Sequence, residues 1–342
     1  MADKIFCELD PIFETIGLLY VSYNFKEVKQ ETIKSLSDLG LDGERFYSQN
    51  FKVYDKYIQI FSKNKKENSE NEFFFSGNDG NYFLILLSLL NENRNWISSF
   101  DLVSDEDINT QIINLCKSIF EYPEIVSIQA LDDIIDFLEK IGLEANSKWK
   151  LLRMMQQPKK YLEAFIRSLN MNLPAYQTAV SEIAKPLKKL LEDYNTSVSN
   201  QSDQKFYEIK DKLSHDSSLY PSLVFPVTQM LSDKSCYYGL LSDVVLKSRK
   251  TQLHSKESLL PKLKALSDSS KLEIITALKV SPKYNLEIAQ QLGLTAATMS
   301  HHMSVLLNCG FVGVEKRDGK VYYHLNKDSM KDLLEELEQT LL

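Results

Sequence analysis

The sequence predicts a mainly α-helical protein with a large helical N-terminal domain, residues 1–248, and a smaller C-terminal domain, residues 249–342. Apolar residues recur with a period of about 3.6 through most of the N-terminal part, as in amphipathic helices. Short helical segments bounded by capping residues and glycines follow residue 258. An Asp-Gly pair between two β-rich runs then predicts a two-stranded hairpin near the end of the chain.

Composition indicates an ordinary globular protein of more than one domain. The chain has 342 residues, of which 43% are apolar and 25% charged. Its longest apolar cluster, residues 82–90, is too short to span a bilayer. The N-terminus carries Asp3 and lacks the long apolar core of a secretion signal. We therefore expect a cytoplasmic protein without a membrane partner.

The N-terminal domain is predicted from its helical periods. Helices are expected over Pro11–Tyr23 and over 26–39, 44–63, 82–91, 105–120 and 131–141, with further helical runs within 148–194. The polar run 63–71 is predicted to be a solvated loop. Segments 219–230 and 236–245 are compatible with short strands or with a return helix, and the sequence does not decide between them.

Charge is unevenly distributed along the chain. Residues 1–248 carry 27 basic and 36 acidic side chains, a balance of −9, whereas residues 249–327 carry 12 basic and 6 acidic ones, a balance of +6. The last fifteen residues return −4. A nucleic-acid partner is therefore expected at the basic segment. The polar, basic run 247–256 suits an exposed linker and marks a domain boundary near residue 250.

Four short helices are predicted in the C-terminal domain. Asp268 suits the N-cap of the second helix, Asn285 opens the third and Thr295 suits the N-cap of the fourth. Gly293 and Gly310 end the third and fourth helices, because glycine adopts the left-handed conformation of a tight helix end. The result is a helix, a three-residue turn and a helix. The four ranges are 259–266, 269–279, 286–292 and 296–309.

The fourth helix, 296–309, has two different faces. Met299, Met303 and Leu306 share one face, which is expected to pack on the preceding helix. The opposite face is small, polar and without formal charge, whereas an ordinary surface helix carries more Lys and Glu. Such a face can enter a DNA major groove about 12 Å wide and reach base edges. With Thr295, the DNA-contact candidates on this helix are Thr298, Ser300, His301 and Ser304.

The hairpin 312–325 is predicted to be a wing beside this helix. Its Asp-Gly turn satisfies the positive φ angles of a type I′ turn. Lys316, Arg317 and Lys320 crowd its tip, where cations can neutralise phosphates or enter the minor groove. An ordinary solvated hairpin would carry similar residues, but the preceding helices favour a DNA contact. Tyr322 on the second strand is a further candidate.

The segments LKALSDSSKLEII (263–275) and TMSHHMSVL (298–306) resemble the winged helix-turn-helix domain of the ArsR/SmtB repressor family. The resemblance covers about residues 258–342. It implies a homodimeric repressor that binds double-stranded operator DNA of two-fold symmetry and releases it on a signal. The regulator is then sequence-specific, with its recognition helix in the major groove and its wing on the backbone or minor groove.

The sequence departs from this family in two ways. The family's metal sensors carry a Cys pair on the third helix or Asp and His ligands on the last helix, and here the third helix has neither Cys nor His. The last helix, 328–342, has no His, and the four cysteines form no CxC or CxxC pair. We therefore predict no metal and no cofactor. The long N-terminal region is the second departure, because typical members are little more than the winged helix.

The last helix carries an apolar stripe that another surface must cover. The partner subunit covers it in this family, and packing on the N-terminal domain would serve equally well physically. We favour the dimer. The stripe consists of Met330, Leu333, Leu334, Leu337 and Leu341.

Catalysis by the N-terminal domain is not expected. No histidine precedes His215, which excludes a Cys-His or Ser-His dyad there, and no glycine-rich phosphate loop precedes a helix. We predict that the protein is not an enzyme and that residues 1–248 form a sensor or oligomerisation domain for a candidate small-molecule or protein effector. The alternative is an interaction adaptor whose winged helix binds a protein.

Overall fold

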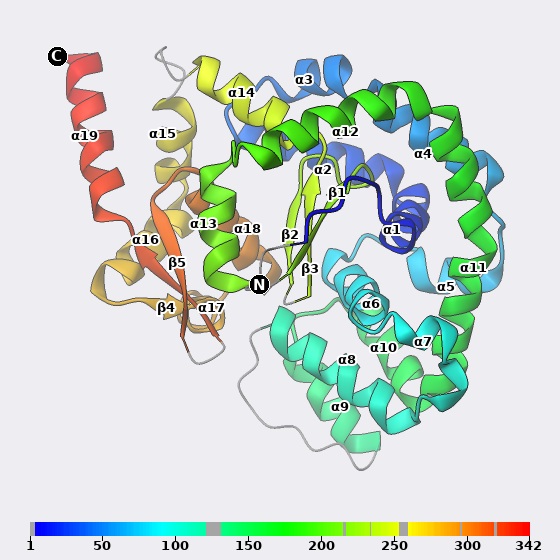
Figure 1. The fold of residues 1–342 in the computed structure, drawn as a ribbon. Coiled ribbons are helices and arrows are strands. Elements are labelled where there is room, and N and C mark those ends of the chain that lie inside the picture. Colours follow the sequence, from blue (N-terminus) through cyan, green and yellow to red (C-terminus); the bar gives the residue numbers. More distant parts are fainter. Residues whose placement is uncertain are drawn as a thin grey trace.

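The computed structural model describes residues 4–120, 131–214, 217–232, 234–252, 259–294, 296–317 and 320–342. Helices dominate it and two small sheets complete it, which confirms the mainly α-helical prediction (Figure 1). Buried residues form two clusters, one within residues 9–245 and one within residues 259–333. These two cores are the observation behind the domain boundary that we propose near residue 250.

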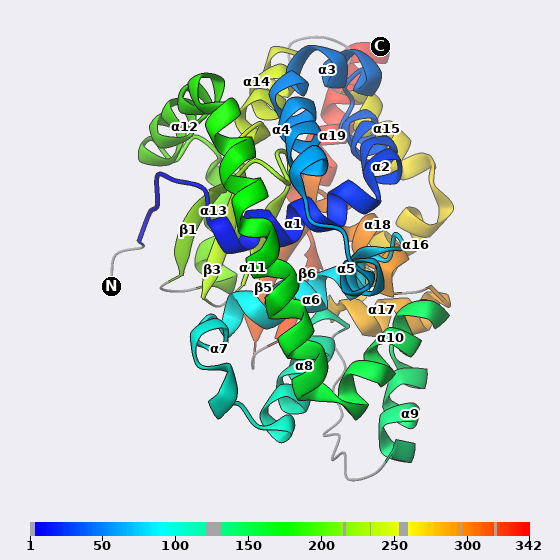
Figure 2. The same ribbon diagram turned by 90° about the vertical axis from the view of Figure 1, so that its right-hand side faces the viewer.

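The N-terminal part is built around α11 (Pro158–Glu182), a long helix that packs on α1, α4, α5 and α8 (Figure 2). Helix α6 is buried over most of its length, so its near-continuous apolar sequence fills the core and does not form a surface stripe. The other helices are α1 (Pro11–Tyr23), α2 (Phe25–Asp38), α3 (Gly43–Asn50), α4 (Lys52–Asn64), α5 (Ser69–Phe75), α6 (Gly80–Glu92), α7 (Asn95–Ser98), η1 (Phe100–Leu102), α8 (Asp105–Ile119), α9 (Leu131–Lys140), α10 (Ala145–Gln156), α12 (Ala184–Ser199), α13 (Gln204–Leu213) and α14 (Ser242–Gln252).

The two segments that the sequence left undecided form most of a three-stranded sheet. Strand β3 (Ser235–Gly239) lies between β1 (Ser218–Ser222), to which it is parallel, and β2 (Gln229–Leu231), to which it is antiparallel. All five residues of β3 are buried, so this central strand lacks the alternation that identifies a half-exposed strand in a sequence. Helix α14 begins at Ser242, directly after the sheet.

A buried carboxylate joins α1, α4 and the segment after β1. Glu14 accepts hydrogen bonds from the Tyr57 hydroxyl at 3.0 Å, from Ser222 Oγ at 2.9 Å, and from the backbone N–H groups of Leu223 and Val224. Its side chain is fully buried, and this burial raises its pKa to about 7.

Two N-terminal predictions were wrong in detail. The single helix expected over 44–63 is two helices, α3 and α4, because Phe51 turns the chain between them and packs on Tyr47 and Tyr54. A bend of one residue does not alter the apolar period enough to be read from sequence. The loop expected over 63–71 is shorter. Asn68 caps α5, and the side chain of Asn71 is buried and donates to the Lys66 carbonyl.

The C-terminal part contains the predicted helices and hairpin. Asp268 caps α16 by accepting from the backbone N–H of Lys271, as expected, and Asn326 caps the last helix. The elements are α15 (Leu259–Ser267), α16 (Ser269–Val280), β4 (Lys283–Tyr284), α17 (Asn285–Leu292), α18 (Ala296–Asn308), β5 (Val312–Arg317), β6 (Lys320–Leu325) and α19 (Lys327–Leu341). Strand β6 lies between β4 and β5.

Candidate nucleic-acid interface

Helices α17 and α18 form the predicted helix-turn-helix. Gly293 ends α17 with φ +65° and Gly310 follows α18 with φ +80°, which are the left-handed conformations that glycine permits. Asn285 begins α17, and its amide donates to Ser300 Oγ on α18 at 3.2 Å. The sequence did not predict this bond, which fixes Ser300 relative to the preceding helix.

The two faces of α18 differ as predicted. Met299, Met303 and Leu306 are at most 1% exposed and belong to the C-terminal core. The opposite side carries four exposed polar side chains without formal charge at neutral pH, and Thr295 lies outside the described residues. The exposed residues are Thr298, Ser300, His301 and Ser304.

The wing lies beside α18 and carries cations toward its tip. Lys316 and Arg317 are exposed on β5. In the antiparallel register of β5 and β6, Arg317 lies opposite Lys320. The guanidinium of Arg317 lies 5.8 Å from the ring centroid of Tyr322 and 2.5 Å from the Glu315 carboxylate. Tyr322 is half-buried and packs edge-on against Tyr284 on β4. Its ring is therefore held in place and forms a cation–π contact with Arg317. The Lys320 side chain lies outside the described residues.

Two N-terminal elements approach this surface. Asp38, at the end of α2, places its carboxylate 3.7 Å from His301 Nε2 on α18. At the wing, Lys316 Nζ donates to the carbonyl of Leu213, the last residue of α13, at 3.0 Å. Sequence reasoning missed Asp38 and Leu213, because no local pattern relates residues so far apart in the chain.

A cavity of about 470 Å³ lies beneath the wing, between the two parts of the chain. Helices α6 and α8 contribute carboxamides and hydroxyls, among them Asn91, Gln111 and Ser118. The wing contributes Lys316 and Val321. This volume is in the range of sites for small organic molecules, and the lining mixes apolar and hydrogen-bonding groups as such sites do.

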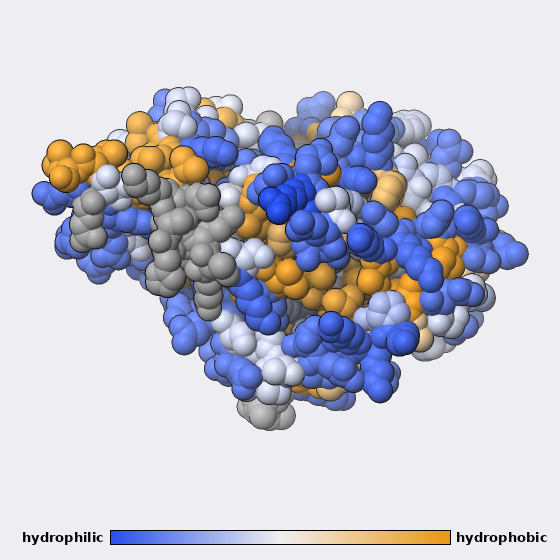
Figure 3. Space-filling model, turned by 90° about the horizontal axis from the view of Figure 1, so that it is seen from above, coloured by the Kyte–Doolittle hydropathy of each residue, from blue (hydrophilic) through white to orange (hydrophobic). Residues whose placement is uncertain are grey.

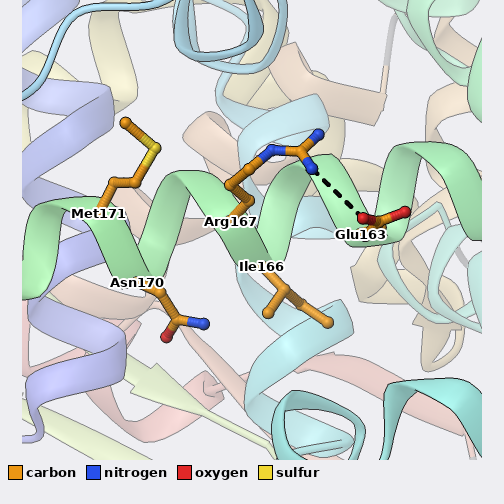
Figure 4. Close-up of a pocket in the computed structure, with 5 residues that line it drawn as sticks. All are labelled: Glu163, Ile166, Arg167, Asn170 and Met171. Atoms are coloured by element: carbon orange, nitrogen blue, oxygen red, sulfur yellow. Dashed lines mark hydrogen bonds and ion pairs between the residues drawn. The ribbon is translucent and has the colours of Figure 1, made fainter.

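A second hollow, of about 420 Å³, lies on the surface of α11 (Figure 4). Its lining residues come from successive turns of this one helix and include Glu163, Ile166 and Met171. Arg167 is already paired with Glu163 at 3.3 Å and with Glu70 at 2.6 Å. A ligand there would be contacted from one side only, so the cavity beneath the wing is the better candidate.

The apolar stripe of the last helix is divided between two surroundings. Leu333 is 1% exposed, and Met330 and Leu337 pack against the same C-terminal core. Leu334 and Leu341 are 65% and 74% exposed.

Helix α15 lies alongside α19, held by an ion pair of 2.6 Å between Lys262 and Glu336. Viewed from above, hydrophobic side chains gather at the end of the molecule where α19 and α15 lie (Figure 3). On α15, Leu260 and Leu263 are 52% and 39% exposed.

Comparison with known proteins identifies the C-terminal part. The family profile described as "Bacterial regulatory protein, arsR family" matches residues 268–314, which run from the cap of α16 into β5. The arsenical resistance operon repressor of Staphylococcus aureus is 33% identical over 75 residues, which are 22% of this chain and 72% of that protein. This chain belongs to the arsR family. It is a DNA-binding transcriptional regulator.

Other transcriptional regulators match to a similar extent. The HTH-type transcriptional regulator CmtR of Mycobacterium tuberculosis is 35% identical over 88 residues, 25% of this chain and 75% of CmtR, and CmtR of Mycobacterium bovis matches equally. These matches leave most of the N-terminal region of this arsR-family chain uncovered. Within the described residues, no three His, Cys, Asp or Glu side chains gather as a metal site requires. No helix in the described ranges is long and apolar enough to cross a membrane.

Proposed function

We propose that this arsR-family regulator is a repressor that binds operator DNA as a homodimer. The exposed, uncharged face of α18 is the observation that carries the proposal. Hydroxyl and imidazole groups of Thr298, Ser300, His301 and Ser304 can donate to and accept from base edges in a major groove. The wing then brings Lys316 and Arg317 to phosphates, where contacts hold the register without reading sequence.

The dimer is supported by the apolar surface that α15 and α19 leave exposed. Leu260, Leu263, Leu334 and Leu341 are between 39% and 74% exposed, and together they offer an apolar patch to a second copy. A two-fold dimer matches the patch with itself and repeats α18 on the other half of a palindromic operator.

The signal of this repressor is a small molecule bound outside the family's usual metal positions. Neither α17 nor α19 carries a Cys or His. The cavity beneath the wing supports this part of the proposal, because Lys316 and Val321 of the wing and side chains of α6 and α8 line the same space. A molecule bound there would contact both the N-terminal region and a phosphate-binding strand.

Binding to DNA fragments tests the central proposal. The protein should bind a fragment of its own promoter region more tightly than bulk DNA at moderate salt. Its affinity should fall steeply between about 50 and 200 mM salt, since displaced counterions drive phosphate contacts. Equal affinity for all fragments would contradict a sequence-specific repressor. A protein partner held by an apolar interface, the adaptor alternative, would instead stay bound across that salt range.

Filling the cavity tests the sensor assignment. Ser118 on α8 lines the cavity and is exposed, so Ser118→Trp should occupy part of the space without disturbing the buried core. We expect this variant to change operator affinity in the absence of any added molecule. Ser181→Trp, at an exposed position near the end of α11, is the matched control and should leave affinity unchanged. Identical operator affinity in the two variants would remove the cavity from the proposal.

A further inference from the structure

Helix α2 and the turn after it lie against α18, the proposed recognition helix, and against α15 of the same C-terminal part. The Asp38 carboxylate faces His301 on α18, and Gly40 abuts Pro261 on α15. Gly40 has φ +88°, and a Cβ built on it would lie 2.3 Å from Pro261 Cγ. The chain can approach α15 this closely only because residue 40 has no side chain. Figure 2 shows α2 on the same side of the molecule as α15 and α18.

A second contact holds the wing. The Lys316 ammonium donates to the Leu213 carbonyl at the end of α13, at 3.0 Å, and α13 lies beside β5 (Figure 1). The Lys316 ammonium has three N–H donors, and the Leu213 carbonyl accepts from one of them. On DNA, the same ammonium group would point at a phosphate. Both DNA-contacting elements are therefore attached to the N-terminal region of the same chain.

The contact between Asp38 and His301 cannot persist when His301 enters a DNA groove. A side chain that reads base edges enters a groove about 12 Å wide and 8.5 Å deep, with phosphates along both walls. Asp38 lies 3.7 Å from the His301 ring, inside the space that the groove wall or floor would fill. Its negative charge would also face phosphates. Helix α2 must leave α18 before His301 can reach a base.

We infer that the N-terminal region binds the DNA-reading surface of its own chain, at α18 through α2 and at the wing through α13, and so holds the regulator off DNA. The occupant of this surface is the acidic N-terminal part, with a charge balance of −9, against a balance of +6 for residues 249–327. DNA is also negatively charged and is attracted to the same basic surface, so DNA and the N-terminal part compete for it. The inference rests on the proposed function.

The individual contacts are weak, which suits a switch. An exposed His–Asp pair contributes little in water, and Lys316 is solvent-exposed. The observed affinity for DNA is then the intrinsic affinity multiplied by the fraction of molecules in which the surface is free. A substitution that loosens α2 should raise that fraction and tighten DNA binding, although it touches no residue that contacts DNA.

The first test is Gly40→Asn in the full-length protein. Asparagine tolerates a positive φ, but its side chain collides with Pro261 and should push α2 away from α15. Gly77→Asn is the matched control, because Gly77 also has a positive φ, +93°, and its nearest neighbour to a built Cβ is 3.8 Å away. We expect Gly40→Asn to lower the Kd for a promoter fragment by about fivefold or more, a typical coupling between two sites, and Gly77→Asn to leave it unchanged.

Asp38→Asn is a second variant that carries little risk to folding, because Asp38 is at a half-exposed helix end. Asp101→Asn, at an exposed position in η1, controls for the loss of one negative charge. Asp38→Asn should tighten DNA binding more than Asp101→Asn does. The inference fails if the wild-type protein binds its promoter fragment and neither Gly40→Asn nor Asp38→Asn binds it more tightly than its control. If neither the wild-type protein nor any of the variants binds that fragment more tightly than bulk DNA, the proposed function itself fails.

Discussion

The imidazole of His301, on the exposed face of α18, lies 3.7 Å from the carboxylate of Asp38 on α2. Burial lowers the pKa of His301 below its ordinary value, Asp38 opposes this shift, and Lys34 and Lys271 add to it. A lowered pKa favours the neutral form of the ring at pH 7. A neutral imidazole has one donor and one acceptor, which is the combination that base edges in the major groove can satisfy.

His301→Ala should relax base specificity. Loss of a base-edge contact costs about 1 to 3 kcal/mol of discrimination at the contacted position. The same change removes the contact with Asp38 in the free chain, so absolute affinity mixes two effects. The informative measurement is the ratio of affinities for the operator and for single-base variants of it. An unchanged ratio at every position would show that His301 does not read a base.

Arg317→Ala should weaken binding to all sequences alike. Arg317 is exposed on the wing and stacks near Tyr322, which suits a phosphate contact. Each phosphate contact contributes about 0.9 to the slope of log K against log salt, so the slope should flatten by roughly that amount. Lys331→Ala, an exposed substitution on α19, is the control for lost positive charge. A loss of specificity without a change in salt slope would reverse the roles assigned to α18 and the wing.

Leu334→Glu should convert the protein to monomers and reduce operator affinity. Leu334 is 65% exposed on α19, so the change costs little within one chain but places a charge in the proposed interface. Sedimentation velocity would report the oligomeric state at matched concentrations. Leu102→Glu is the control, since Leu102 is 85% exposed in η1. Dimers that persist in Leu334→Glu would move the interface away from α19.

Features encoded by neighbouring residues were predicted well. Asp268 caps α16, Gly293 takes the left-handed conformation, and Met299 and Met303 are buried, because each depends on residues within about one or two helical turns. The sequence also predicted the wing from its turn. The arsR-type resemblance placed these parts in a known order.

Features that join distant residues were not predicted. Asp38 meets His301, and Glu14 accepts from the backbone at Leu223 and Val224, across more than 200 residues in the second case. Periodicity shows which face of a helix is buried and not which element covers it. For the same reason the stripe on α19 was only partly understood, since α15 of the same chain covers a share of it.

Glu14 gives the N-terminal region a pH-dependent stability. Its pKa is raised by burial to about 7, whereas in the unfolded chain it returns to an ordinary value near 4.5. Between these values the folded protein keeps the proton and the unfolded chain releases it. The free energy of unfolding therefore falls as pH rises from about 4.5 to about 7, by roughly 3 kcal/mol from this group, and changes little above that range.

Glu14→Gln should abolish that fall. A carboxamide oxygen in place of Oε1 can still accept from Ser222 Oγ, from Leu223 N–H and, at 3.3 Å, from Val224 N–H. The NH₂ in place of Oε2 can donate to the Tyr57 hydroxyl but loses the 3.0 Å bond from Val224 N–H, so the neutral side chain keeps most of these bonds. Urea unfolding followed by tryptophan fluorescence would measure the effect at pH 5 and pH 7.5, because both tryptophans, Trp96 and Trp149, lie in the N-terminal region. The wild-type protein and Glu182→Gln, at an exposed position in α11, should both lose stability between these pH values. If Glu14→Gln loses stability to the same extent, the pH dependence arises from other groups.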